Sequence, residues 1–124
     1  MIKLAFTLHR LPELSREQFQ TYWSETHAPL VAQHAKALGI KRYVQLHTSD
    51  AEINEALRAS RGAPEPFDGI AELWFESEAT LTAAMQTPEG IAAGSALLED
   101  ERRFIDLEKS PMWIAEEKVV VDES

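Results

Sequence analysis

The chain has no cysteine among its 124 residues, which excludes disulfide bonds, thiolate nucleophiles and thiolate metal ligands. Basic residues are also few: 12 lysines and arginines stand against 21 aspartates and glutamates, for a formal net charge of −9. Because nucleic acids and anionic membranes bind basic surfaces, we expect neither as a partner. No apolar run approaches the roughly 18 residues that a membrane-spanning helix requires.

Sequence motifs for common cofactors are missing too. There is no GxGxxG, P-loop or GxSxG pattern and no lysine context typical of pyridoxal phosphate, which disfavours nucleotide cofactors and a serine nucleophile. Of the four histidines, His27 and His34 share a predicted helix face but lie about 10 Å apart, too far for one ion. His9 and His47 belong to different predicted strands. We therefore expect no metal and no cofactor.

Hydrophobic residues make up 44% of the chain, enough for one folded domain over residues 1–124. The first ten residues alternate in polarity and do not resemble a signal peptide, so we expect a cytoplasmic protein. This alternation predicts a strand over 2–9, with Ile2, Leu4, Phe6 and Leu8 on one apolar face.

A long helix is expected to follow, over residues 15–38. Ser15 and Gln18 fit a capping box, in which each side chain satisfies a free backbone donor of the first turn. Apolar spacing continues past Pro29, so we predict a kink there rather than an end. Gly39 is a suitable C-terminal stop.

The rest of the chain alternates strands and helices less regularly. Residues 40–48 form a predicted strand, and 48–68 a loop or a short helix that Asp50 would cap and that would end near Gly62. The remaining predicted elements are a strand at 70–75, a helix opened by Ser77 or Thr80, a helix starting at Thr87-Pro88 and running toward Phe104, a closing strand through 113–115 and 118–121, and a free tail at 122–124.

This order of elements predicts an α+β fold in which helices cover one face of a four-stranded antiparallel sheet. The other face also carries leucine, valine and isoleucine, and a second copy of the chain would cover it most simply. We therefore expect a symmetric homodimer.

Several segments resemble the EthD-domain family: RLPELSREQFQTYWSETHAPLV, IKRYVQLH, FDGIAELWFES and LEDERRFID. The resemblance spans nearly the whole chain. It implies a ferredoxin-like βαββαβ sandwich that pairs into a dimeric α+β barrel. Its superfamily includes cofactor-free methylmuconolactone isomerases and polyketide cyclases as well as haem-binding relatives, so it constrains the fold more than the chemistry.

His27 is the leading candidate for catalysis. It follows Phe19 and Trp23 at four-residue spacing, which places all three on the helix face toward the sheet. A packed core histidine is the structural alternative. An imidazole titrates near neutrality and can move a proton in either direction. The resemblance also implies a functional histidine at this position, as in the isomerases.

Tyr43 is the second candidate, because a phenol can hydrogen-bond an oxyanion and the isomerases carry a tyrosine at the matching place. On the same strand face, His47 lies roughly 13 Å further along, at the rim of any pocket. Tyr22 lies beside His27 and would position a ligand, or it is a half-buried aromatic with its hydroxyl in water. The isomerases use a further histidine after this strand, and this chain has none beyond His47.

The predicted walls of the pocket are apolar side chains from the helix and the third strand: Phe19, Trp23, Leu73 and Phe75. Glu72 is an acid among apolar neighbours on that strand. We interpret Glu72 as a residue of the dimer interface that pairs with a base such as Arg42. The alternatives are an ordinary carboxylate at a sheet edge and a proton acceptor with a raised pKa.

The sequence thus predicts a small cofactor-independent enzyme that performs proton-transfer chemistry as an isomerase, cyclase, decarboxylase or other lyase. Its substrate would be an aromatic or lactone-like intermediate of catabolic or polyketide type. His27 would be the general acid and base, and Tyr43 the donor to a developing oxyanion. One alternative is a non-catalytic dimer that binds a small molecule, and another is a haem-binding protein with His27 as the ligand.

Overall fold

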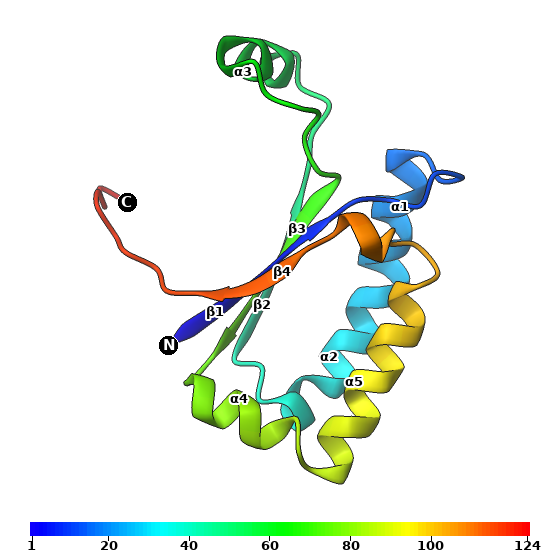
Figure 1. The fold of residues 1–124 in the computed structure, drawn as a ribbon, viewed down its shortest axis with the longest axis vertical. Coiled ribbons are helices and arrows are strands. Elements are labelled where there is room, and N and C mark those ends of the chain that lie inside the picture. The colour runs from blue at the N-terminus through cyan, green and yellow to red at the C-terminus, as the bar shows by residue number, and fades with distance from the viewer.

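Four antiparallel strands form one sheet, and helices pack on one of its faces (Figure 1). A computed structural model describes all residues 1–124. The strands are β1 (Ile2–Leu8), β2 (Arg42–His47), β3 (Gly69–Phe75) and β4 (Met112–Ala115). The helices are α1 (Arg16–Tyr22), α2 (Ala28–Leu38), α3 (Ile53–Arg61), α4 (Glu78–Ala84) and α5 (Pro88–Glu101). None of them is both long enough and apolar enough to traverse a lipid bilayer.

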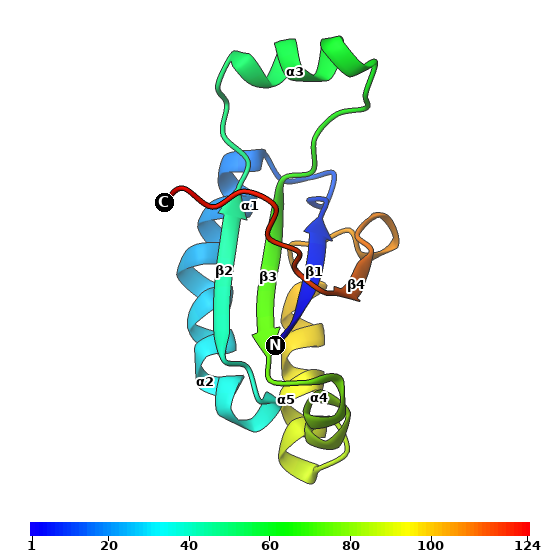
Figure 2. The same cartoon turned by 90° about the vertical axis from the view of Figure 1, so that its left-hand side faces the viewer.

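The strands lie in the order β2-β3-β1-β4, and every neighbouring pair is antiparallel. Together with the βαββαβ chain order, this arrangement confirms the predicted ferredoxin-like sandwich. Behind the sheet, α2 and α5 run side by side along the strands, while α3 projects away from them (Figures 1 and 2).

Strand register decides which side chains face the helices. Leu4 lies opposite Leu73, and Leu73 lies opposite Tyr43, so these three residues share the inner face of the sheet. The core beneath the helices is a cluster of buried apolar residues: Phe6, Leu8, Phe19, Trp23, Ala71, Phe104 and Ile105. This core lies toward the α1 end of the sandwich.

The long N-terminal helix begins and ends where the sequence predicts. Ser15 Oγ accepts from the backbone N–H of Gln18 at 3.1 Å, and the Gln18 side chain accepts from the backbone N–H of Ser15 at 2.9 Å. Gly39 ends the helix with a left-handed φ of 75°. Both predictions are confirmed.

The irregularity predicted at Pro29 takes the form of a π-helical turn at Trp23–His27, between α1 and α2. Pro29 has no N–H to donate, and a proline ring crowds the carbonyl four residues earlier. One extra residue in the preceding turn relieves that crowding, and the N–H of Ala28 then bonds the carbonyl of Trp23. The turn places His27 at the junction of the two helices.

Two predictions about irregular regions are wrong. Asp50 does not cap α3; it pairs instead with Arg16 at 3.3 Å, although the helix does end at Gly62. Residues 118–121 do not continue the closing strand. Ala115 already lies opposite Lys3, so β1 has almost no residues left to pair with a longer β4.

A buried ion pair joins the loops at one end of the sheet. Asp68 accepts from the Arg10 backbone at 2.8 Å, from the Arg10 side chain at 2.6 Å and from Arg16 at 3.0 Å. Burial alone would raise the pKa of Asp68, but these hydrogen bonds and the arginine charges hold it below its usual range. The carboxylate therefore ties β1, α1 and β3 together.

We expect Asp68→Asn to lower the free energy of unfolding at pH 7 by about 3 kcal/mol, because it leaves two arginines with a weaker, neutral partner. The loss should shrink as pH falls through the depressed pKa of the native carboxylate, since protonation removes the same charge. Urea denaturation measures both effects. Asp50→Asn is the matched control, because Asp50 pairs with the same Arg16 but is exposed. An equal effect of the two substitutions would contradict this assignment.

Candidate functional site

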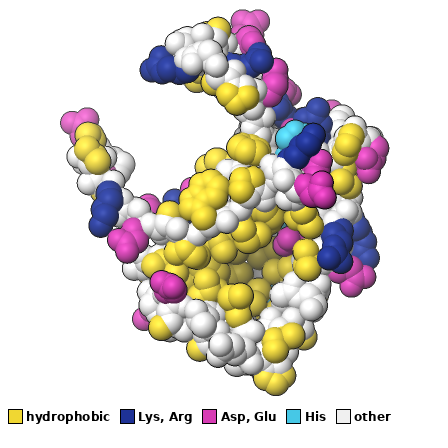
Figure 3. Space-filling view, viewed as in Figure 1, with side chains coloured by type: hydrophobic (Ala, Val, Ile, Leu, Met, Phe, Trp, Pro, Cys, Tyr) yellow, Lys and Arg dark blue, Asp and Glu magenta, His cyan; other side chains and the backbone are white.

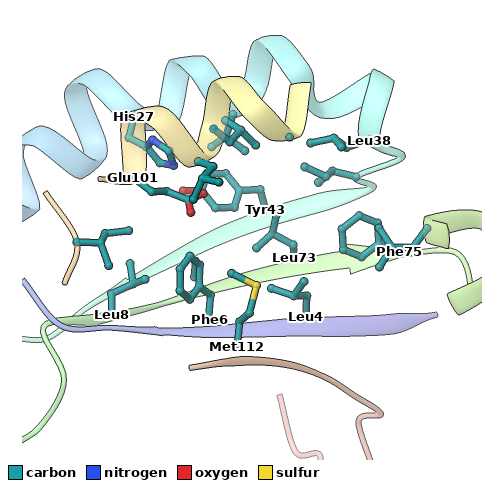
Figure 4. A pocket seen from close by; sticks show the side chains of 18 of the residues that line it. Leu4, Phe6, Leu8, His27, Leu38, Tyr43, Leu73, Phe75, Glu101 and Met112 are labelled. Carbon is teal, nitrogen blue, oxygen red and sulfur yellow. The ribbon is translucent and has the colours of Figure 1, made fainter. Parts of the chain in front are cut away.

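A cavity of about 320 Å³ lies between the inner face of the sheet and helices α2 and α5. Figure 3 shows it as a hollow lined by hydrophobic side chains. Of its 20 lining residues, 17 are hydrophobic, and the lining groups able to exchange a proton in water are His27, Tyr43 and Glu101 (Figure 4). Such a volume, with a few converging polar groups, is typical of a small-molecule site.

His27 ends the π-helical turn, and only 5% of its surface is exposed. Its Nδ1 lies 2.7 Å from Oδ2 of Asp100, which comes from α5. A carboxylate can only accept, so Nδ1 carries the proton and donates it. This is the only hydrogen bond of the imidazole within the protein, which leaves the lone pair of Nε2 available to the cavity that His27 lines. Burial lowers the pKa of His27, and the bond to Asp100 partly opposes this shift.

Asp100 is the buried hub of the site. Its Oδ1 accepts from the hydroxyl of Tyr22 at 2.6 Å and from Arg103 at 3.1 Å, while Oδ2 accepts from His27. Burial alone would raise its pKa, but the hydrogen bonds from Tyr22, His27 and Arg103 hold that pKa below its usual value. Asp100 therefore stays ionised and fixes the tautomer and the orientation of the imidazole.

Tyr43 reaches the cavity from β2. Its hydroxyl oxygen accepts from Nε2 of Gln45 at 2.8 Å, and the same amide nitrogen donates to the carbonyl of Trp23 at 3.0 Å. Both amide hydrogens are thereby used, so the phenolic proton of Tyr43 is free to donate to a ligand. Burial raises the pKa of Tyr43, which keeps that proton in place.

Glu101 is the third polar group, and neither its spacing nor its neighbours singled it out in the sequence. Burial, reinforced by the negative charge of Asp100, raises its pKa to about 7. No lysine, arginine or histidine nitrogen forms an ion pair with it. Asp100 and Glu101 both belong to the LEDERRFID segment, which pointed to a late helix but not to a site.

The structure brings some predicted site residues together and separates others. Five of the predicted residues line the cavity: His27, Tyr43, Trp23, Leu73 and Phe75.

Three other predicted residues do not line this cavity. Phe19 is fully buried in the core against Phe104. The hydroxyl of Tyr22 is bound by Asp100, so it supports His27 through that carboxylate instead of facing a ligand. The His47 ring stacks on the Trp23 ring with 4.6 Å between centroids, and its Nε2 lies 2.8 Å from Oε1 of Gln45.

Glu72 faces away from the helices and pairs with Lys3 of the same chain at 3.0 Å. Arg42 lies over the Trp74 ring at 4.9 Å. The charge of Glu72 is therefore already matched within the chain. No group of three or more histidine and carboxylate side chains is placed to hold a metal ion.

Fold and site together define a ferredoxin-like α+β protein with a buried histidine–aspartate pair at an apolar cavity. The EthD domain family model matches residues 11–108, and the chain belongs to this family. No curated protein matches it in sequence.

Solved structures share the fold at low identity. An EthD family protein of Bacillus halodurans is 23% identical, with a TM-score of 0.61 over 95% of this chain and 100% of that one. A dimeric ferredoxin-like protein of Bacteroides fragilis is 12% identical, with a TM-score of 0.57 over 93% and 94%. SnoaB, a cofactor-independent oxygenase of Streptomyces nogalater, is 16% identical, with a TM-score of 0.51 over 98% and 95%.

We expect Asp100→Asn to lower the pKa of His27 further, because the substitution removes the negative charge that favours the imidazolium. NMR titration of the imidazole Hε1 resonance measures this pKa. Glu99→Gln on the same helix is the matched control and should leave it in place, since Glu99 does not contact His27. An unchanged pKa in Asp100→Asn would show that the pair does not set the charge of the histidine.

Proposed function

We propose that the protein is a small cofactor-independent enzyme that moves a proton on an apolar aromatic or lactone-like molecule. The observation that carries the proposal is the hydrogen bond between Asp100 and His27, which leaves Nε2 of the imidazole free at an apolar cavity. Tyr43 supplies a hydroxyl proton to the same space. Isomerisation, cyclisation, decarboxylation and related lyase steps all need such a base and such a donor.

The proposed step begins at a carbon next to a carbonyl group. Nε2 of His27 takes the proton, the C–H electron pair moves to form a C=C bond, and the carbonyl π electrons move to the oxygen. Tyr43 donates a hydrogen bond to that oxyanion, and Asp100 stabilises the imidazolium. Where a further C=C bond is conjugated with the enolate, returning the proton to the γ-carbon regenerates the carbonyl and gives an isomer, so His27 ends the cycle neutral.

The fold is compatible with chemistry that needs no cofactor, since SnoaB is a cofactor-independent oxygenase. Haem fits this cavity poorly. The two propionates of haem require basic partners. The lining contains no lysine or arginine, and its one carboxyl group, Glu101, cannot pair with a propionate. We therefore derive no step through haem. The remaining rival is a binding protein that holds the same kind of ligand without turning it over.

Solvent deuterium exchange distinguishes an enzyme from a binder without knowledge of the natural product. We expect the wild type to catalyse exchange of the α-hydrogens in a panel of aryl ketones and aromatic-fused lactones, followed by ¹H NMR. His27→Ala should lower the rate by at least about 100-fold, and Tyr43→Phe by about the same factor. His34→Ala is the control, because His34 lies on α2 outside the cavity. Equal rates in His27→Ala and wild type would contradict the proposal.

We also infer that the chain forms a homodimer through the open face of its sheet. This outer face carries Val44 and Leu46 of β2, Ile70 and Trp74 of β3, and Trp113 of β4. Trp113 is 49% exposed, and no helix of the chain covers it. The structural relative from Bacteroides fragilis is dimeric, which supports the same assembly here.

Light scattering coupled to size-exclusion chromatography should give twice the chain mass for the wild type. Trp113→Glu should shift the protein to monomer, because it places a charge on the apolar face that the two copies would bury. Ile91→Glu, on the exposed surface of α5, should remain dimeric. A wild-type monomer at micromolar concentration would overturn the inferred assembly while leaving the proton-transfer proposal intact.

A further inference from the structure

Glu101 is the only carboxyl group among the residues that line the cavity. Figure 4 shows its side chain pointing into the cavity between His27 and Tyr43. The charged and titratable groups around it are Asp100 on its own helix, His27 on the π-helical turn and Tyr43 on β2. The residues of β1, β3 and β4 that line the same cavity are all apolar.

We propose that Glu101 acts as a carboxylic acid that donates a hydrogen bond to the substrate, and that it thereby selects uncharged carbonyl compounds and rejects carboxylates. This inference rests on the proposed function, because it concerns the substrate class of the same cavity. It adds a second donor beside Tyr43 and a rule of charge selection that the proton-transfer scheme alone does not contain.

The position of Glu101 favours the protonated form. An ionised carboxylate here would lack a cationic partner, would be surrounded by hydrocarbon and would lie next to the carboxylate of Asp100 in the chain. Burial and the charge of Asp100 accordingly raise the pKa of Glu101 to about 7. Between the lowered pKa of His27 and the pKa of Glu101, the three cavity groups are uncharged: a neutral imidazole, a phenol and a carboxylic acid.

These three groups are complementary to one kind of ligand. The free Nε2 of His27 accepts a proton, while the hydroxyls of Tyr43 and Glu101 donate, so a neutral carbonyl oxygen has two donors and an adjacent carbon has a base. As negative charge develops on that oxygen, both donated hydrogen bonds strengthen. A ligand that already carries a carboxylate would enter an apolar cavity that has no cation to compensate it.

Three naphthalenes of similar shape test this selection by isothermal titration calorimetry: 2-acetylnaphthalene, 2-ethylnaphthalene and 2-naphthoate. For the wild type we expect the affinity for the ketone to fall at least fivefold between pH 6 and pH 8.5, because Glu101 loses the proton that it donates. The hydrocarbon should bind with little dependence on pH. Naphthoate should bind at least tenfold more weakly than the ketone at pH 6.

Glu101→Gln keeps a neutral donor at all pH values, so the affinity for the ketone should become independent of pH. Glu101→Leu removes the donor and should lose the preference for ketone over hydrocarbon, which covers the case in which one variant misfolds. Glu99→Gln, an exposed glutamate on the same helix, should behave as the wild type. Burial lowers the pKa of His27, and Glu101→Gln separates the two groups, because a pH dependence that came from the histidine would persist in that variant.

A pH-dependent ketone affinity that persists in Glu101→Gln would overturn the inference, as would tighter binding of naphthoate than of ketone to the wild type, or no binding of the ketone at all. Deuterium exchange keeps this failure separate from failure of the proposed function. If His27→Ala abolishes exchange while Glu101→Gln binds all three probes as the wild type does, proton transfer stands and the role of Glu101 falls.

Discussion

The hydrogen bond between Asp100 and His27 links the two halves of the helical layer. The histidine comes from the π-helical turn between α1 and α2, the aspartate from the end of α5, and 73 residues separate them in the chain. The bond fixes the proton on Nδ1 and so leaves Nε2 available at the cavity. Since Asp100 also accepts from Tyr22 and Arg103, one buried carboxylate both joins the helices and orients the imidazole.

The cavity exists because the side chains of α2 and α5 do not fill the space between these helices and the apolar face of the sheet. At the α1 end, Phe19, Trp23 and Phe104 close the sandwich as a packed core. Further along, the same layers enclose the space lined by Leu4, Leu73 and Phe75. Such a place favours neutral reactants, because a charged group inside it must be paired or be neutralised by gaining or losing a proton. The free imidazole nitrogen, the Tyr43 phenol and the raised pKa of Glu101 all agree with that constraint.

The sequence predicted the fold and several of the residues that line the candidate cavity. Periodicity and caps located most elements, because Ser15, Gln18 and Gly39 act through neighbours within one turn of the helix. The prediction that Asp50 caps α3 is wrong, because its carboxylate pairs instead with Arg16, which is distant in the sequence. Asp100 and Glu101 were missed for a related reason. The end of α5 is acidic, and in the sequence Asp100 and Glu101 look like the solvated glutamates near them. Only the contacts with distant residues such as His27 and Tyr22 distinguish them.

The sequence by itself determined the strand and helix order, the apolar face of the sheet and the helix face that carries His27, since these follow from local periodicity and capping. Only the tertiary structure decided that Asp100 holds the imidazole, that Tyr22 and His47 lie outside the cavity, and that Glu101 reaches into it. Those outcomes depend on burial and on contacts between distant segments. The physical reason is that solvation and charge pairing, unlike periodicity, are properties of the assembled interior.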